Sequence, residues 1–256
     1  MSHAPDLDDH ALAAALAHQA GQHLLELRRR AGHSDPKALR ADGDRLSHEL
    51  LMAELATMRP EDAVLSEEGK DDAARLRVDR VWIVDPLDGT REYGEEGRTD
   101  WAVHVALWQA GDLVAGAVAL PGRELVLGTG DPPAVPPPTG QPPRLLVSRT
   151  RPPGLVGDVA EQLGGTLVAL GSAGAKAMAV ALGEAEIYLH AGGQYEWDSA
   201  APVAAARAAG LHCSRVDGSA LAYNQPDPLL PDLLICRSEL AEPVLAAVKA
   251  TGLGGT

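Results

Sequence analysis

Apolar residues recur with helical spacing over the first part of the chain. Leucine and alanine at every third or fourth position from Leu12 to Leu27 predict a first surface helix. The same spacing from Leu46 to Leu55 predicts a second helix, which Asp44 would open as an N-cap after a polar loop over residues 34–43. The chain is therefore expected to begin with two amphipathic helices.

Strand patterns follow the two helices. Short apolar runs at 63–65 and 81–84 predict two strands, and a parallel or mixed pairing would bring their carboxyl ends together. Three further runs within 101–128 are joined by Gly-Asp and Pro-Gly turns, which predicts an antiparallel meander. We expect the meander to extend the same sheet.

A proline-rich stretch then interrupts the pattern. Seven of the thirteen residues from 131 to 143 are proline, which excludes a helix or a central strand. Beyond it strands and helices alternate, as is typical of an α/β layer, so the fold class is α+β or α/β. We expect one domain over 1–130, a linker over 131–143 and a second domain over 144–256. The second half is predicted to hold strands at 145–147, 166–170, 186–190, 212–216 and 233–236, and helices at 155–163, 173–182, 199–209 and 238–249.

Acidic side chains stand at the ends of several predicted elements. Asp85 and Asp88 follow the strand at 81–84 in an Asp-Pro-Leu-Asp-Gly-Thr turn, at the strand end where α/β proteins usually carry their chemistry. Taken singly, each acidic residue is explained by a turn, a helix cap or solvent. If they converge, mutual repulsion raises their pKa values and disfavours folding unless hard cations such as Mg²⁺ neutralise them. The set comprises Asp44, Glu67, Glu68, Asp85, Asp88 and Asp198.

Charge and composition exclude several classes of partner. The formal net charge of the 256 residues is −14, and no basic stripe is present that would neutralise nucleic-acid phosphates or anionic membranes. The sequence shows neither a signal peptide nor the roughly 20 apolar residues of a membrane-spanning helix, so we expect a soluble, cytoplasmic protein. Cys213 and Cys236 lie in apolar surroundings and are predicted to be free thiols, which suits a reducing compartment.

The ordered motifs resemble the signature of the inositol monophosphatase family, which comprises lithium-sensitive, Mg²⁺-dependent phosphatases. The matching runs are Glu67-Glu68, Trp82 to Thr90 and Trp197 to Ala201, with Gly171-Ser172, Lys176 and residues 183–188 between the second and third. The resemblance covers nearly the whole chain.

Finer details of these runs are similar to the actinobacterial CysQ-type branch, the 3′-phosphoadenosine 5′-phosphate phosphatases of sulfate assimilation. The resemblance implies a layered αβαβα sandwich that acts on a small-molecule nucleotide as a monomer or homodimer, with Mg²⁺ as cofactor and Li⁺ as inhibitor. The expected products are AMP and phosphate.

The resemblance also implies a role for each matching residue. Asp44 and Thr90, together with Glu68, would form the catalytic set that orients and deprotonates a water. The amides of Gly89 and Thr90 would bind the phosphate. Further substrate contacts would come from Asp88, Gly171, Ser172 and Lys176. Two or three Mg²⁺ ions would be held by Glu67, Asp85, the Leu87 carbonyl, Asp88 and Asp198.

Two positions bear on these assignments. Asp42 also precedes the second predicted helix, and Asp44 is preferred because it would open that helix. Inositol-specific members carry a glutamate seven residues before the last aspartate, where this chain has Ala191. Inositol phosphate is therefore disfavoured as the main substrate.

Three alternatives stay open. One is a broader phosphatase acting on fructose 1,6-bisphosphate or inositol 1-phosphate. A second is a haloacid-dehalogenase phosphatase with a phosphorylated aspartate, but those enzymes have one residue between the two aspartates and this chain has Pro86 and Leu87. The third is a non-catalytic cation-binding protein, for which the hydroxyl of Thr90 would have no use.

Overall fold

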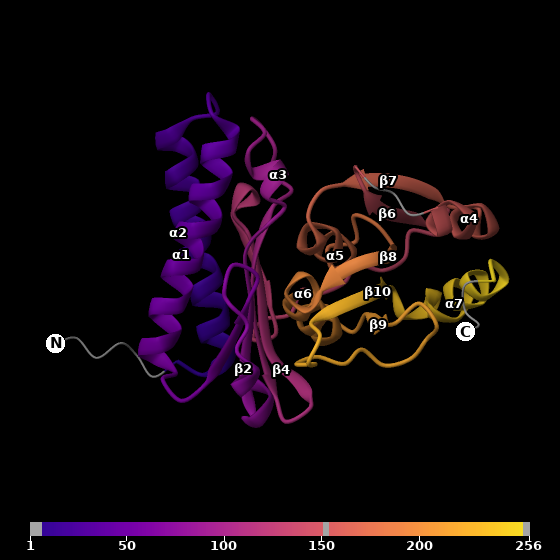
Figure 1. Ribbon diagram of the computed structural model, residues 1–256. Helices are drawn as coiled ribbons and strands as arrows, with labels where there is room; N and C mark the ends of the chain where they lie inside the picture. Colours follow the sequence, from indigo (N-terminus) through magenta and orange to yellow (C-terminus); the bar gives the residue numbers. More distant parts are fainter. Residues whose placement is uncertain (1–6, 151–153, 253–256) are drawn as a thin grey trace.

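The computed structural model describes residues 7–150 and 154–252, which form five stacked layers (Figure 1). Two helices cover one face of a first sheet, and two more helices fill the space between this sheet and a second one. A last pair of helices covers the outer face of the second sheet. The αβαβα sandwich expected from the sequence is confirmed.

The outer helical layer consists of α1 (Asp9–Ala31) and α2 (Pro36–Met58). The expectation that Asp44 opens α2 is wrong, because α2 begins eight residues earlier, at Pro36, with Asp35 as its N-cap. Proline is favoured at the first helical position, where its missing N–H costs nothing. Glycine is favoured at position 43, inside α2, because a Cβ there would lie 2.8 Å from the Tyr93 ring and 2.9 Å from Leu87. The predicted polar loop is therefore mostly helix.

The first sheet has the strand order β1-β2-β3-β4-β5. Strand β1 runs parallel to β2, and the following strands form the expected antiparallel meander. The predicted turn at Asp85 is wrong in one respect, because β2 continues to Asp88 with an irregularity between the two aspartates. The bounds are β1 (Ala63–Ser66), β2 (Arg80–Asp88), β3 (Ala102–Gln109), β4 (Asp112–Leu120) and β5 (Leu125–Gly128), with the short helices η1 (Ala73–Arg77), α3 (Thr90–Tyr93) and η2 (Pro121–Arg123) between them.

The stretch 131–143 contains no helix or strand, and the second sheet begins directly after it. This sheet has the order β7-β6-β8-β10-β9, with β6 parallel to β7 and β8, and β10 antiparallel to β8 and β9. Its strands are β6 (Arg144–Ser148), β7 (Thr166–Leu170), β8 (Ile187–Tyr195), β9 (His212–Ser214) and β10 (Leu229–Cys236). The helices are α4 (Gly154–Leu163), α5 (Ala173–Ala181), α6 (Glu196–Ala208), η3 (Ser238–Leu240) and α7 (Ala241–Ala250).

Three hydrophobic cores hold the layers together. One lies between α1, α2 and the first sheet, the second surrounds α5 and α6 between the sheets, and the third lies under α4 and α7. Helix α6 is almost wholly buried, and its alanines let both sheets approach closely. The first turn of α6 lies next to the end of β2, because a carboxylate oxygen of Asp198 comes within 4.8 Å of those of Asp85 and Asp88.

Within the described ranges, none of the helices combines the length and the apolar character needed to cross a bilayer. Both cysteines are free thiols. Burial raises the pKa of each thiol to about 12, so neither side chain is a reactive thiolate at neutral pH.

Candidate active site

The end of β2 delivers two aspartates to the space between the layers. Asp85 is 1% exposed and Asp88 is 7% exposed. The irregularity in the β2–β3 pairing turns the backbone here, and the Leu87 N–H donates to Asp85 Oδ1 at 3.0 Å. Ser47 of α2 donates to the Pro86 carbonyl at 2.7 Å, which fixes the irregular segment against the outer helices.

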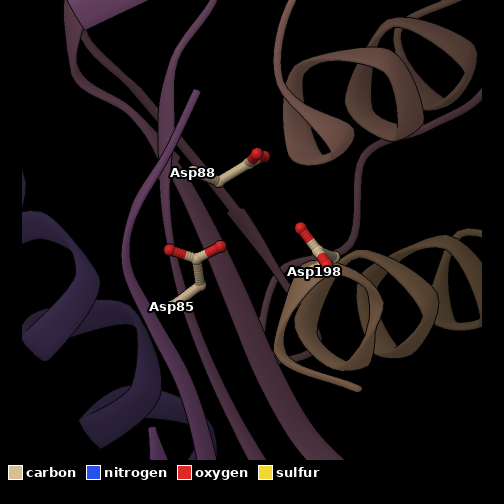
Figure 2. A group of neighbouring side chains, drawn as sticks. All are labelled: Asp85, Asp88 and Asp198. Carbon is tan, nitrogen blue, oxygen red and sulfur yellow. The ribbon is translucent and has the colours of Figure 1, made fainter. Parts of the chain in front are cut away.

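Asp198 lies opposite Asp85 and Asp88, across the space between the layers (Figure 2). One carboxylate oxygen from each of Asp85, Asp88 and Asp198 lies within 4.8 Å of the others. The predicted start of this helix at residue 199 needs correction, because α6 starts at Glu196 and Asp198 occupies its first turn. Its Oδ2 accepts a hydrogen bond from the Tyr195 N–H at 2.7 Å, which leaves the carboxylate facing the aspartates of β2.

Glu67 completes the acidic cluster. It follows β1, whose parallel register with β2 sets Ser66 opposite Val84, so Glu67 reaches hydrogen-bonding range of Asp85. The predicted meeting of the two strand ends is thus observed. Glu68 is exposed beside Glu67, and its charge acts on Asp44.

Three members of the cluster bind protons more tightly than isolated carboxyls. Burial, together with the charges of Glu67 and Asp88, holds the pKa of Asp85 well above its ordinary range. Burial and the charge of Asp88 raise the pKa of Asp198 to about 6. Glu67 has exposed surface, yet its carboxyl loses hydration against the cluster, and this raises its pKa to about 7. Such a set of crowded hard oxygen donors fits a divalent cation.

Asp88 has the opposite electrostatic environment. Burial alone would raise its pKa, but the charge and hydrogen bond of His104, and then Ser172, outweigh burial and lower it. Ser172 Oγ donates to Asp88 Oδ2 at 2.5 Å, and the Gly174 N–H donates to the same oxygen at 2.7 Å. His104 Nε2 lies 3.2 Å from Asp88 Oδ2, while His104 Nδ1 lies 3.0 Å from the Trp197 carbonyl.

His104 was not among the predicted site residues. It is fully buried in β3, and the only signal in the sequence is a histidine inside an apolar run. The pairing of Asp85 with His104 across β2 and β3 is what carries the imidazole to the acidic cluster.

Asp44 and Thr90 lie together on the α2 side of the site. Thr90 Oγ1 is 3.3 Å from Asp44 Oδ1 and 3.0 Å from the Leu87 carbonyl oxygen. Burial and the charge of Glu68 raise the pKa of Asp44 to about 6. Asp42 is exposed and pairs with Arg45, away from Thr90. Of the two candidates, Asp44 is therefore the one beside the threonine.

The acidic cluster opens into a cleft of about 350 Å³ between the two sheets. Gly89 and Thr90 line one side, and Gly171, Ser172 and Lys176 line another, so the structure brings the predicted substrate residues to one place. Lys176 Nζ donates to the carbonyls of Gly171 and Ser172 and lies 5.2 Å from the centre of the Tyr188 ring. Burial lowers its pKa, opposed by the charge of Asp88.

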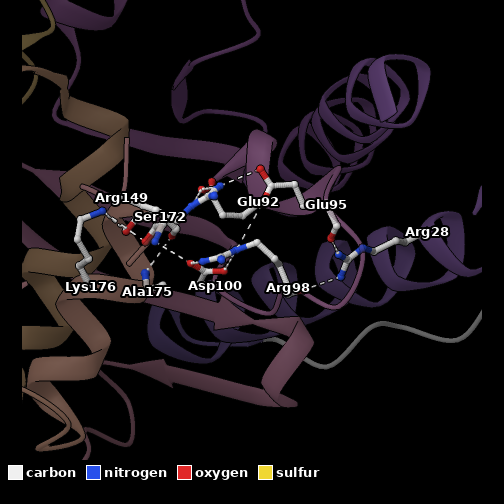
Figure 3. A network of polar contacts seen from close by, with 10 residues as sticks. Arg28, Glu92, Glu95, Arg98, Asp100, Arg149, Ser172, Ala175 and Lys176 are labelled. Atoms are coloured by element: carbon white, nitrogen blue, oxygen red, sulfur yellow. Dashed lines mark hydrogen bonds and ion pairs between the residues drawn. The ribbon is translucent and has the colours of Figure 1, made fainter. Parts of the chain in front are cut away.

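A network of ion pairs borders the cleft (Figure 3). Arg149 of the second half pairs with Glu92 and Glu95, each at 2.8 Å, next to the short helix α3. Asp100 accepts the Gly171 N–H at 2.7 Å and pairs with Arg98. These contacts tie the segment that carries Thr90 to the segment that carries Ser172. The sequence offered no spacing from which Arg149 could be assigned to this network.

Comparison with known proteins gives a consistent result. A model of the inositol monophosphatase family matches residues 7–130 and 147–252. The 3′-phosphoadenosine 5′-phosphate phosphatase of Mycobacterium leprae is 51% identical, and the match covers 95% of this chain and 94% of that protein. The 3′(2′),5′-bisphosphate nucleotidase CysQ of Escherichia coli is 30% identical over 73% of this chain and 80% of its own length.

Solved structures share the architecture. The crystal structure of CysQ from Bacteroides thetaiotaomicron, a bacterial member of the inositol monophosphatase family, superposes with a TM-score of 0.75 at 28% sequence identity. The match covers 89% of this chain and 96% of that one.

Proposed function

Because the chain belongs to the inositol monophosphatase family, we propose that it is a Mg²⁺-dependent phosphatase that removes the 3′-phosphate of 3′-phosphoadenosine 5′-phosphate to give AMP and phosphate. The observation that carries the substrate is the 51% identity, over almost the whole length, to a protein with that activity in its name. The acidic cluster beside Thr90 and Asp44 supports the chemistry.

The donor set fits Mg²⁺ better than a soft metal. The ligand atoms would be carboxylate oxygens of Glu67, Asp85, Asp88 and Asp198 with the Leu87 carbonyl, and the described residues of the cluster include no cysteine. Bound Mg²⁺ supplies a lowered pKa for water and stabilises the charge on the leaving oxygen. Burial and the neighbouring carboxylates raise the pKa values of Glu67, Asp85 and Asp198, and the charges of His104 and Lys176 offset this only in part at Asp198.

Asp44 acts as the general base in this proposal. A base is most effective when its pKa lies near the working pH, and the pKa of Asp44 is raised to about 6. The Thr90 hydroxyl lies between Asp44 and the Leu87 carbonyl, and these two contacts fix its position. A hydroxyl held in this way can orient a water by hydrogen bonding. Glu68 tunes the pair through its charge.

The substrate side of the proposal uses the cleft. The amides of Gly89 and Thr90 bind the scissile phosphate, and Gly171, Ser172 and Lys176 form the wall beside the nucleotide. Ser172 also holds Asp88 and caps α5, so it couples the cation site to that wall. Ala191 leaves the inositol-binding position without a carboxylate.

We further propose that the enzyme works in the cytoplasm as a monomer or homodimer, with residues 1–130 and 144–256 as two domains that share the site. Li⁺ would inhibit by competing at the cation site.

Phosphate release from three substrates tests the proposal. We expect kcat/KM for 3′-phosphoadenosine 5′-phosphate to exceed that for fructose 1,6-bisphosphate and inositol 1-phosphate. Activity should disappear in a chelator and fall in Li⁺. Asp85→Asn should be almost inactive, whereas Asp131→Asn, an exposed change in the proline-rich stretch, should be normal. Full activity in the chelator, or a higher kcat/KM for either competitor, would overturn the assignment.

A further inference from the structure

Gln194 carries a buried polar atom that no described residue satisfies. The residue is 7% exposed and lines the cleft wall. Its Nε2 donates to the Tyr188 hydroxyl at 2.8 Å. Its Oε1 is buried and has no hydrogen-bond partner among residues 7–150 and 154–252. A buried carbonyl oxygen without a donor has lost its hydration and gained nothing in return, so such atoms are uncommon in folded proteins.

The backbone is shaped to place this side chain. Residues six apart in an extended strand are separated by about 20 Å, yet the side chains of Tyr188 and Gln194 are hydrogen-bonded. The pairing of β8 with β10 shifts by one residue here, since Ala191 and Gln194 face two residues of β10 that are only two apart. Gly192 and Gly193, with φ of 109° and 81°, supply the left-handed conformations that this bulge requires. Bulges of this kind re-aim a side chain, and this one aims Gln194 into the cleft.

The backbone next to Gln194 is also held beside the acidic cluster. The Tyr195 N–H, on the peptide that follows Gln194, donates to Asp198 Oδ2 at 2.7 Å. On the other side Tyr188 packs its ring near Lys176 Nζ. These two contacts anchor Gln194 in the wall of the cleft that Asp198 also lines.

From these contacts, and resting on the proposed function, we propose that Gln194 is a specificity-determining residue whose Oε1 accepts a hydrogen bond from the sugar hydroxyl next to the phosphorylated carbon. The proposed nucleotide substrate has two uncharged kinds of donor, the ribose 2′-hydroxyl and the exocyclic amine of the base. Only the hydroxyl is adjacent to the phosphate that must lie at the acidic cluster. Sites that hydrogen-bond a substrate hydroxyl discriminate strongly against analogues that lack it, because the protein atom is then left unpaired.

Kinetics with 3′-phosphoadenosine 5′-phosphate and its 2′-deoxy analogue test this role. The unmodified enzyme should prefer the ribonucleotide by about 10-fold or more in kcat/KM. In Gln194→Met, which keeps the length of the side chain and removes its polar atoms, the preference should fall towards unity. Gln162→Met makes the same chemical change at an exposed position of α4 and should keep the full preference.

A second variant and a second readout keep the test decisive. Gln194→Glu retains an acceptor oxygen but adds negative charge beside Asp198, so it should lower kcat/KM for both substrates and preserve the ratio between them. The Mg²⁺ affinity of Gln194→Met, measured by calorimetry without substrate, should match that of the unmodified protein. An unmodified enzyme that cleaves both substrates equally, or an unchanged ratio in Gln194→Met, would overturn the role of Gln194 and leave the proposed function intact. An enzyme that cleaves neither substrate would instead refute the proposed function.

Discussion

Replacing Asp198 by asparagine should stabilise the metal-free protein at neutral pH and lose that advantage in acid. Burial and the charge of Asp88 raise the pKa of the Asp198 carboxyl to about 6 in the folded protein, from the ordinary aspartate value of about 3.9. The folded state therefore binds this proton more tightly than the unfolded state. The resulting stability is fully present below about pH 4 and is lost as the pH rises through about 6.

The size of the effect follows from the shift in pKa. Raising the pKa from about 3.9 to about 6 corresponds to about 3 kcal/mol once the carboxyl is ionised in both states. Asparagine has no proton to lose and can still accept the Tyr195 N–H through its carbonyl oxygen. The free energy of unfolding of Asp198→Asn, relative to the unmodified protein, should therefore rise by about 3 kcal/mol between about pH 4 and about pH 8.

Urea unfolding in a chelator, repeated across this pH range, measures the difference. Asp131→Asn, which changes an exposed carboxyl in the proline-rich stretch, should run parallel to the unmodified protein. Excess Mg²⁺ should then reverse the order at neutral pH, because an ion at about 1,000 times its Kd stabilises the folded state by about 4.1 kcal/mol and the variant has lost a ligand. If the curves for Asp198→Asn and the unmodified protein stay parallel in the chelator, the account of the acidic cluster is wrong.

Three other substitutions probe separate parts of the molecule. Thr90→Ala should lower kcat by about 100-fold or more while Mg²⁺ affinity in calorimetry stays unchanged, because the hydroxyl orients a water and is not a ligand. Gly174→Ala should destabilise the protein by roughly 1–3 kcal/mol in urea unfolding, since a Cβ there would lie 2.1 Å from His104 Nε2. Arg75→Met should cost roughly 2 kcal/mol or more in the same assay, because the buried guanidinium donates to Asn224 Oδ1 at 2.6 Å and its loss leaves that oxygen unpaired.

The elements that follow a simple period were predictable from the sequence. The stripe from Leu12 to Leu27, the meander over 101–128 and the alternation after residue 143 each appear in the structure close to their expected bounds. The acidic site was predictable for a related reason. Carboxylates at the ends of neighbouring buried strands lie at the same edge of the sheet. Glu67 reaches Asp85 in this way, through the parallel pairing of β1 with β2.

The start of α2 was not predictable from local pattern alone. Asp44 looks like an N-cap because the residues before it are polar and include Gly43, which is a poor helix former. In the folded protein Gly43 is needed where α2 packs against Leu87 and Tyr93, so tertiary contact overrides local propensity. Asp44 consequently reaches Thr90 from the middle of a helix, a more rigid support than a helix end would provide.

The electrostatic difference between Asp85 and Asp88 also lay beyond the sequence. The two residues are three positions apart, yet burial and neighbouring carboxylates raise the pKa of Asp85, while His104 and the start of α5 lower the pKa of Asp88. The difference depends on β3 and α5, which reach Asp88 only through long-range packing.

This difference has a structural consequence for the site. Asp88 is already stabilised as a carboxylate by Ser172, Gly174 and His104, so it joins the first sheet to the helices behind the cleft whether or not a cation is bound. Glu67, Asp85 and Asp198, by contrast, keep raised pKa values in the metal-free protein, so a bound cation would favour their ionised forms. A cation at this cluster would therefore connect the strand ends and α6 to an aspartate that is already fixed to the substrate wall. In such an arrangement the affinity for the ion and the geometry of the cleft depend on each other, because the same carboxylate belongs to both.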